Sequence, residues 1–372
     1  MKDLNILKSG LLITLLFVGM ILPAQVMVTK INPGSSQPGG EGFFYSLPKT
    51  VLKIDLVLQK TSRIPGPLAS FASDYLGVDD VIKTSSESYQ LLNATVVPSA
   101  VTDANQMYFV QLPIEKGKDE RNMSFHLAEN GALVSVNDNE AKAVYFQTPD
   151  VNQTFYFTEG SEGFDYLAGY NKTKKQDTIV RKISIDTVTI NRFLFKTTWV
   201  DKSEKERAEE AAQQISKIRE ARFNLLTGYH EVNFGESMQY MDGQLREMEQ
   251  KYLDLFLGKE TTTLVRETIF YTPQLGEKQS SIWRSPGGES VGVELNTTAL
   301  LKGLSESPVA SPNMVFYRIP AECMVKINFG GKTYFNSLLL INQLGAISTA
   351  PLSKAKLHFN PLTGNIMGVQ KD

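Results

Sequence analysis

Hydrophobic and polar positions alternate with a period of two over most of this chain. Between residues 52 and 58 every second side chain is leucine or isoleucine, and short apolar runs separated by turn residues continue to about residue 200. Alternation of this kind is typical of sheet strands with one covered face. We therefore predict a β-rich N-terminal domain over residues 43–200. Its last strand places four residues on one face: Phe193, Phe195, Thr197 and Trp199.

The period then changes to steps of three and four, which indicates helix. Ser203 and Glu206 have the spacing of a capping box, and Gly228 ends this first helical segment. A second segment runs from about residue 236 to 257. Because the connection is short, the two helices are expected to be antiparallel. The pattern predicts a long helical hairpin over residues 201–258.

The connection between these helices carries aromatic residues where a polar turn would be expected. Tyr229 and Phe234 place apolar groups at this tip. Either the tip docks on a β-rich domain of the same chain, which is the commoner use of such residues, or it inserts into a partner. On the second interpretation, Tyr229 and Phe234 are candidate partner contacts.

Strand patterns return after Gly258. Gly330 and Gly331 are a strong signal for a two-residue hairpin between two strands. No later stretch is long and periodic enough for a major helix. We predict a second β-rich domain over residues 259–372. The expected fold class is α+β, with two β-rich, sandwich-like domains joined by the long antiparallel helical hairpin.

The first 24 residues have the pattern of a signal peptide. Two lysines form a short basic region, residues 11–22 are almost entirely apolar, and Ala24 supplies a small residue at the cleavage position. The apolar stretch is shorter than the ~20 residues of a membrane-spanning helix, although a retained anchor is the alternative. Residues 25–42 are rich in Pro, Gly and Ser and predict a flexible leader. We expect an exported mature chain without a membrane span.

Length, charge and cysteine content narrow the possibilities further. A chain of 372 residues is expected to contain two domains or more. Lys and Arg number 38 against 40 Asp and Glu, so no basic excess indicates a nucleic-acid partner. The single cysteine, Cys323, lies on the apolar face of a period-two segment. This position favours a buried core thiol over a nucleophile.

The sequence contains no recognisable catalytic motif. The three histidines, His126, His230 and His358, lie in different regions, and neither HExxH nor G-x-S-x-G occurs. We therefore predict no catalytic residue, no metal ligand and no cofactor. Two carboxylates that only folding brings together leave no sequence pattern, so a carboxylate-dependent hydrolase acting on glycan or peptide is the alternative.

Aromatic residues near glycine-rich turns are the remaining candidates for binding. Tyr166 and Tyr170 lie among glycines, and Trp283 precedes the turn at residues 284–288. Exposed rings on loops can stack on sugar faces or anchor a partner protein, and they can equally hold loops onto a sheet. We treat these three residues as candidate partner or glycan contacts.

Five segments carry a likeness to a known family, namely 44–50, 64–77, 225–228, 238–257 and 317–320. Together they resemble an uncharacterised family of exported Bacteroidota proteins that is known as a domain of unknown function. The resemblance covers nearly all of the mature chain and implies export and a shared architecture, without supplying a ligand or a catalytic residue. It also implies the periplasm or outer surface of a Gram-negative bacterium.

These features lead to one expected function. We expect an exported cell-envelope protein that is not an enzyme, and that binds another envelope protein or a glycan or serves as an assembly component. Nucleic acid is not an expected partner.

Overall fold

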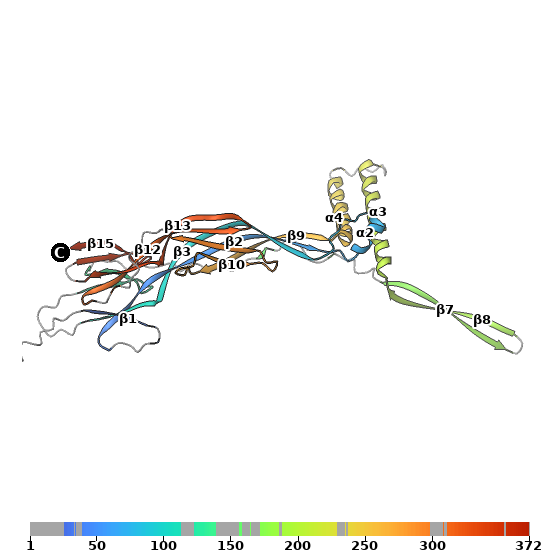
Figure 1. Ribbon diagram of the computed structural model, residues 1–372. Helices are drawn as coiled ribbons and strands as arrows, with labels where there is room; N and C mark the ends of the chain where they lie inside the picture. The colour runs from blue at the N-terminus through green and yellow to red at the C-terminus, as the bar shows by residue number, and fades with distance from the viewer. Residues whose placement is uncertain are drawn as a thin grey trace, which may run out of the picture. The chain divides into compact units, whose positions relative to one another are not determined.

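A computed structural model describes residues 26–32, 34, 39–112, 123–138, 156–157, 164, 172–185, 188–228, 235, 237–297, 308, 311–352 and 355–371. Most of these residues lie in β-strands (Figure 1). The strands are β1 (Met27–Ile31), β2 (Gly42–Ile64), β3 (Ser86–Gln111), β4 (Phe125–Leu127), β5 (Leu133–Val136), β6 (Tyr156–Phe157), β7 (Lys172–Ile185), β8 (Val188–Asp201), β9 (Lys259–Tyr271), β10 (Gln279–Arg284), β11 (Ser290–Thr297), β12 (Met314–Phe329), β13 (Lys332–Pro351), β14 (Ala355–Phe359) and β15 (Ile366–Lys371).

The described strands form four sheets. One has the order β1-β3-β2-β9-β6, a second has the order β10-β11-β12-β13, and a third has the order β15-β14-β5-β4. Strands β7 and β8 pair only with each other. Antiparallel pairing prevails, so the topology is built largely from hairpins and returning strands.

The chain divides into two compact units, and both are discontinuous in sequence. The first unit consists of Met1–Val57, Leu91–Thr154 and Arg266–Asp372. The second consists of Leu58–Gln90 and Phe155–Val265. Three of the four boundaries between them therefore fall inside strands, namely β2, β3 and β9.

The predicted fold class, α+β with two sandwich-like domains joined by a long helical hairpin, is wrong. The chain is mostly β, and within its described part no helical hairpin links two sequential β-rich domains. The main reason is strand length, because β2 has 23 residues and β3 has 26, against about 5–6 for an ordinary strand. Alternation reveals that a segment is a strand, but it does not reveal where the strand passes from one compact unit to another.

The helices are a minor part of the structure. They are η1 (Ala69–Phe71), α2 (Ala72–Leu76), α3 (Glu204–Thr227) and α4 (Ser237–Leu257). The predicted capping box at the start of α3 is confirmed: the Ser203 hydroxyl accepts from the Glu206 N–H, and the Glu206 carboxylate accepts from the Ser203 N–H at 2.7 Å. Hydrogen bonds from the Ser203 N–H and hydroxyl to the carboxylate lower the pKa of Glu206.

The core of the second unit forms where its helices meet. Small side chains on α3 allow close approach to larger ones on α4, since Ala208 and Ala211 share a cluster with Leu255 and Phe256. All four side chains are buried. Half-buried ion pairs add to this packing, because the Arg222 guanidinium donates to both Asp242 and Glu249 on α4. Hydrogen bonds from Arg219 and Arg222 lower the pKa of Glu249.

The predicted flexible leader is wrong for residues 27–31, which form β1 and pair with β3. Val26 and Val28 lie in the core of the first unit. The Val26 N–H donates to the Asn313 side-chain oxygen at 3.0 Å, and the Asn313 N–H donates to the Val26 carbonyl at 2.9 Å. The proline- and glycine-rich composition of the following residues concealed this short strand.

The core of the first unit is organised by stacked aromatic rings. Tyr45 on β2 stacks on Tyr108 of β3, and Tyr108 stacks on Phe316 of β12, with ring centroids 5.3 and 4.6 Å apart. The Tyr45 hydroxyl donates to the Phe316 carbonyl at 3.3 Å and accepts from the Phe316 N–H at 3.0 Å. Burial raises the pKa of Tyr45 well above its usual value and that of Tyr108 to about 12. The Tyr45 hydroxyl thus makes the two backbone hydrogen bonds with Phe316 that a neighbouring strand could otherwise make.

Two local predictions for the C-terminal part are confirmed. Gly330 and Gly331 form the two-residue turn between β12 and β13, and both have positive φ, as a type I′ hairpin requires. Cys323 is fully buried on β12 and faces the core of the sheet. Burial raises the pKa of its thiol, which opposes a nucleophilic role.

Across the described residues, none of the helices has the length and apolar character needed to cross a membrane.

We expect the substitution Tyr45→Phe to destabilise the first unit by about 1–3 kcal/mol, because both backbone groups of Phe316 would be left buried without their partner. Urea unfolding measures this cost. The matched control is Tyr334→Phe, since the half-buried Tyr334 makes no hydroxyl hydrogen bond within the described chain and its loss should cost little. Equal stability losses in the two variants would contradict this interpretation.

Candidate functional site

A wide bulge in β13 brings polar side chains into the first unit. Ile319 pairs with Ala346 and Ala321 pairs with Ile341, so residues 342–345 all lie opposite Pro320. Proline cannot donate to the ladder, which favours an interruption at this point. A Cβ on Gly345 would come within 1.8 Å of the Ile319 carbonyl oxygen, so only glycine fits there.

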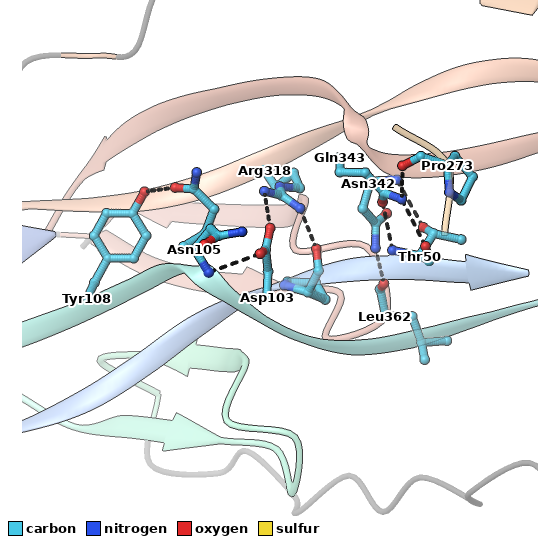
Figure 2. A network of polar contacts seen from close by, with 11 residues as sticks. Thr50, Asp103, Asn105, Tyr108, Pro273, Arg318, Asn342, Gln343 and Leu362 are labelled. Atoms are coloured by element: carbon cyan, nitrogen blue, oxygen red, sulfur yellow. Dashed lines mark hydrogen bonds and ion pairs between the residues drawn. The ribbon is translucent and has the colours of Figure 1, made fainter. Parts of the chain in front are cut away.

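The bulge residues Asn342 and Gln343 hold β2 at Thr50 (Figure 2). The Gln343 amide accepts from the Thr50 N–H at 2.8 Å and donates to the Thr50 carbonyl at 2.9 Å, as a neighbouring strand would. It also donates to the Pro273 carbonyl at 3.0 Å. The Asn342 N–H donates to the Thr50 hydroxyl at 2.9 Å, and its side-chain amide donates to the Leu362 carbonyl at 2.7 Å.

A buried ion pair lies in the same network (Figure 2). The Arg318 guanidinium, whose side chain is 4% exposed, donates to the Asp103 carboxylate at 3.1 Å and to the Pro48 carbonyl at 2.8 Å. The other Asp103 oxygen accepts from the Asn105 N–H at 3.1 Å. Desolvation lowers the pKa of Arg318, while the Asp103 charge opposes that shift.

This network connects strands rather than forming a reaction centre. Asp103 is the one buried carboxylate among the described residues, and its two oxygens are taken by Arg318 and Asn105. The oxygen of the Asn342 side chain is the only buried polar atom of the network without a hydrogen-bond partner in the described chain. In that same part of the chain no cluster of His, Cys, Asp and Glu could hold a metal ion. The geometry therefore supports a structural role for the network, which holds β2, β3, β12 and β13 together.

The second candidate site is the ribbon formed by β7 and β8 (Figure 1). The two strands pair over their full length, from Lys172 opposite Asp201 to Ile185 opposite Val188. Partners in this register share a face. Phe193, Phe195 and Trp199 therefore lie on one face, and their side chains are 57%, 66% and 63% exposed. We call this surface the aromatic face.

The aromatic face is bordered by lysines. Lys174 lies opposite Trp199 in the register, with its ammonium group 5.0 Å from the centre of the indole ring. A contact of this kind orients the ring and contributes about 0.5–1 kcal/mol at an exposed site. Val180 lies opposite Phe193 and is itself half-exposed, so the apolar surface continues across both strands.

The ribbon is also strongly basic. Its described side chains, at positions 172–182 and 192–201, include seven Lys and Arg against two Asp, a net charge of +5 in a chain whose net charge is -2. Arg181 and Arg192 lie directly opposite each other on the second face. Neither forms an ion pair within the part of the chain that the structure describes. Like charges in this position repel and destabilise the pair.

Of the five contact candidates predicted from sequence, one lies within the described residues. Trp283 lies on β10, opposite Val291, and is half-buried. The other four candidates, Tyr166, Tyr170, Tyr229 and Phe234, lie outside the described residues.

The aromatic face is the surface that the sequence interpretation missed. The shared face of Phe193, Phe195 and Trp199 is visible in the sequence, but a covered face is the usual meaning of such a stripe. One usable signal lies in the preceding segment of the sequence. Positions 172, 174 and 175 are lysines there, rather than the apolar residues that a covered face requires.

Comparison with known proteins identifies a family without a described activity. The family described as "Domain of unknown function (DUF4831)" matches residues 41–167 and 166–367. The chain therefore belongs to this family. No curated protein and no solved structure matches it.

We expect the buried ion pair to be strongly coupled. Arg318→Met should destabilise the first unit by about 3–5 kcal/mol, because Asp103 stays buried without its counter-charge. Combining it with Asp103→Asn should cost clearly less than the sum of the single losses. A double-mutant cycle followed by urea unfolding measures the coupling.

The matched control is the more exposed pair Lys326–Glu294 on the same unit, at 3.6 Å. Lys326→Met and Glu294→Gln should couple by less than about 1 kcal/mol. Similar coupling energies in the two cycles would show that the Arg318–Asp103 pair is no more than a surface contact.

Proposed function

We propose that this member of the DUF4831 family is an exported, non-catalytic protein of the cell envelope that binds a partner through the β7–β8 ribbon. The observation that most directly supports this proposal is the aromatic face, on which Phe193, Phe195 and Trp199 are each more than half exposed. Large aromatic side chains supply much of the free energy of protein interfaces, and clusters of exposed rings mark interaction sites.

The energetics of a two-stranded sheet support a binding role. An isolated hairpin is marginally stable in water, because it has no third strand and no opposing layer against which to bury its side chains. Burying the exposed part of each ring against a partner contributes roughly 1–2 kcal/mol. A partner would therefore stabilise the ribbon as well as bind to it.

Export and location rest on the N-terminal sequence and on the family resemblance. The basic, apolar and small-residue order of residues 1–24 is that of a cleaved signal peptide. Cleavage after Ala24 leaves Val26 available for the core of the first unit, where it is buried. The proposed destination is the periplasm or the outer surface of a Gram-negative bacterium.

A carboxylate-dependent hydrolase has no comparable support. Glycoside hydrolysis by this route needs two carboxyl groups roughly 5–10 Å apart on either side of the substrate bond. The buried carboxylate of Asp103 is instead held by Arg318.

Removal of the ribbon tests the proposal. Because Lys172 and Asp201 are opposite each other in the register, residues 173–200 can be replaced by a short Asn-Gly turn. We expect this variant to keep the stability of the first unit and to lose its co-migration with envelope partners after chemical cross-linking in intact cells. A ribbon-free chain that is still incorporated into the same cross-linked species would refute the proposed function.

Protein sequencing tests the processing step. We expect the mature protein from an envelope fraction to begin at Gln25. As a control, Ala24→Arg should block cleavage, because a small residue is required next to the cleaved bond. Recovery of unprocessed wild-type chain that still begins at Met1 would contradict export by this route.

A further inference from the structure

Resting on the proposed function, we infer that the outer edge of β8 binds an extended peptide segment of another protein in which acidic and apolar residues alternate. The inference joins two properties of β8, the unpaired backbone along its outer edge and the alternating chemistry of its side chains.

Among the described residues, no strand pairs with the outer edge of β8. The strand runs for 14 residues and pairs on one side with β7, and no other described strand lies on its other side. Alternate N–H and C=O groups of such a strand point outward and can pair with an added strand. Addition of an extended peptide to an exposed edge is a common recognition mode, with backbone bonds giving affinity and side chains giving specificity.

The side chains of β8 differ between its two faces. The aromatic face carries Phe193, Phe195 and Trp199, whereas the second face carries the exposed cations Arg192 and Lys196. Side chains of an added strand alternate in the same way. An added strand therefore matches β8 when its apolar side chains lie beside the rings and its acidic side chains lie beside Arg192 and Lys196.

The second face lacks negative charge where the cations concentrate. On this face Arg192 lies opposite Arg181, whereas Lys196 lies opposite an acid, Asp177. A carboxylate on an added strand next to Arg192 would relieve the repulsion between the two guanidinium groups. The arrangement also opposes a second copy of this chain, because two ribbons with a net charge of +5 repel each other.

Other anionic partners fit the ribbon less well. An element that lies on a membrane separates an apolar face from a charged face, whereas here Lys172, Lys174 and Lys182 share the aromatic face. An anionic glycan could meet the cations and the rings, but it would leave the outward backbone groups of β8 without partners.

The test uses the full mature chain and synthetic peptides of roughly 10 residues, the length of an ordinary strand. The first peptide alternates glutamate with valine and threonine. A second carries lysine in place of glutamate, and a third has the composition of the first with its glutamates in one block. We expect calorimetry to detect binding of the first peptide alone, and hydrogen exchange to show new protection in β8.

Backbone pairing is tested with N-methylated versions of the first peptide. Methylating every second amide removes the donors on one edge of the peptide, so one of the two methylation registers should abolish binding and the other should preserve it. Equal binding of both registers would overturn strand addition.

Charge complementarity is tested with the double variant Arg192→Glu/Lys196→Glu. We expect at least about tenfold weaker binding of the glutamate peptide and new binding of the lysine peptide. The control, Lys172→Glu/Lys182→Glu, changes the net charge equally but on β7, and should weaken binding by about threefold or less.

Two further probes separate this inference from the proposed function. If dextran sulfate or phosphatidylglycerol vesicles bind, and the variant Phe195→Ser/Trp199→Ser abolishes that binding while no peptide binds, the ribbon is a binding surface and strand addition is wrong. If the ribbon-free chain binds the glutamate peptide as well as the natural chain does, the inference fails whatever the ribbon does in cells.

Discussion

A two-stranded antiparallel ribbon leaves both faces and both outer edges uncovered, and this constraint governs how β7 and β8 can function. In the described chain these strands pair only with each other, yet they carry three large exposed rings and seven basic residues. Neither feature contributes to folding in the way that a buried ring or a paired charge would. The proposed binding through the aromatic face and the inferred strand addition at β8 follow from the same constraint, because a partner would supply the missing third strand and the missing layer.

The first unit satisfies its polar groups in the opposite manner. There the side chains replace strand partners: Gln343 pairs with both backbone groups of Thr50, and the Tyr45 hydroxyl meets both backbone groups of Phe316. Arg318 and Asp103 neutralise each other in the interior. Polar residues that pair in this way specify one arrangement of long strands, and they leave little capacity for chemistry. This contrast favours the exposed ribbon over the buried network as the functional surface of the protein.

Sequence patterns identified local structure better than they identified connectivity. The capping box at Ser203, the turn at Gly330 and Gly331 and the buried thiol of Cys323 each depend on neighbouring residues, and each is confirmed. The fold class failed because the pairing of β2 and β3 with distant strands is not encoded in their alternation. Two of the segments that carry the family resemblance, 44–50 and 317–320, supply both sides of the Arg318–Pro48 contact, although nothing local indicates that they meet. The aromatic face of β8 was visible as a pattern, but its exposure depends on the absence of a covering layer, which only the topology of the described chain reveals.

Cysteine labelling in intact envelopes tests the central claim most directly, because the native thiol of Cys323 is buried and gives little background. Thr197→Cys places a reactive group on the aromatic face, and Leu275→Cys places one at a site that is 82% exposed in the first unit. In purified protein both thiols should react rapidly with a membrane-permeant maleimide. In intact envelopes the account predicts that the thiol at position 197 becomes protected while that at position 275 stays reactive. Equal reactivity of position 197 in the two settings would contradict the account.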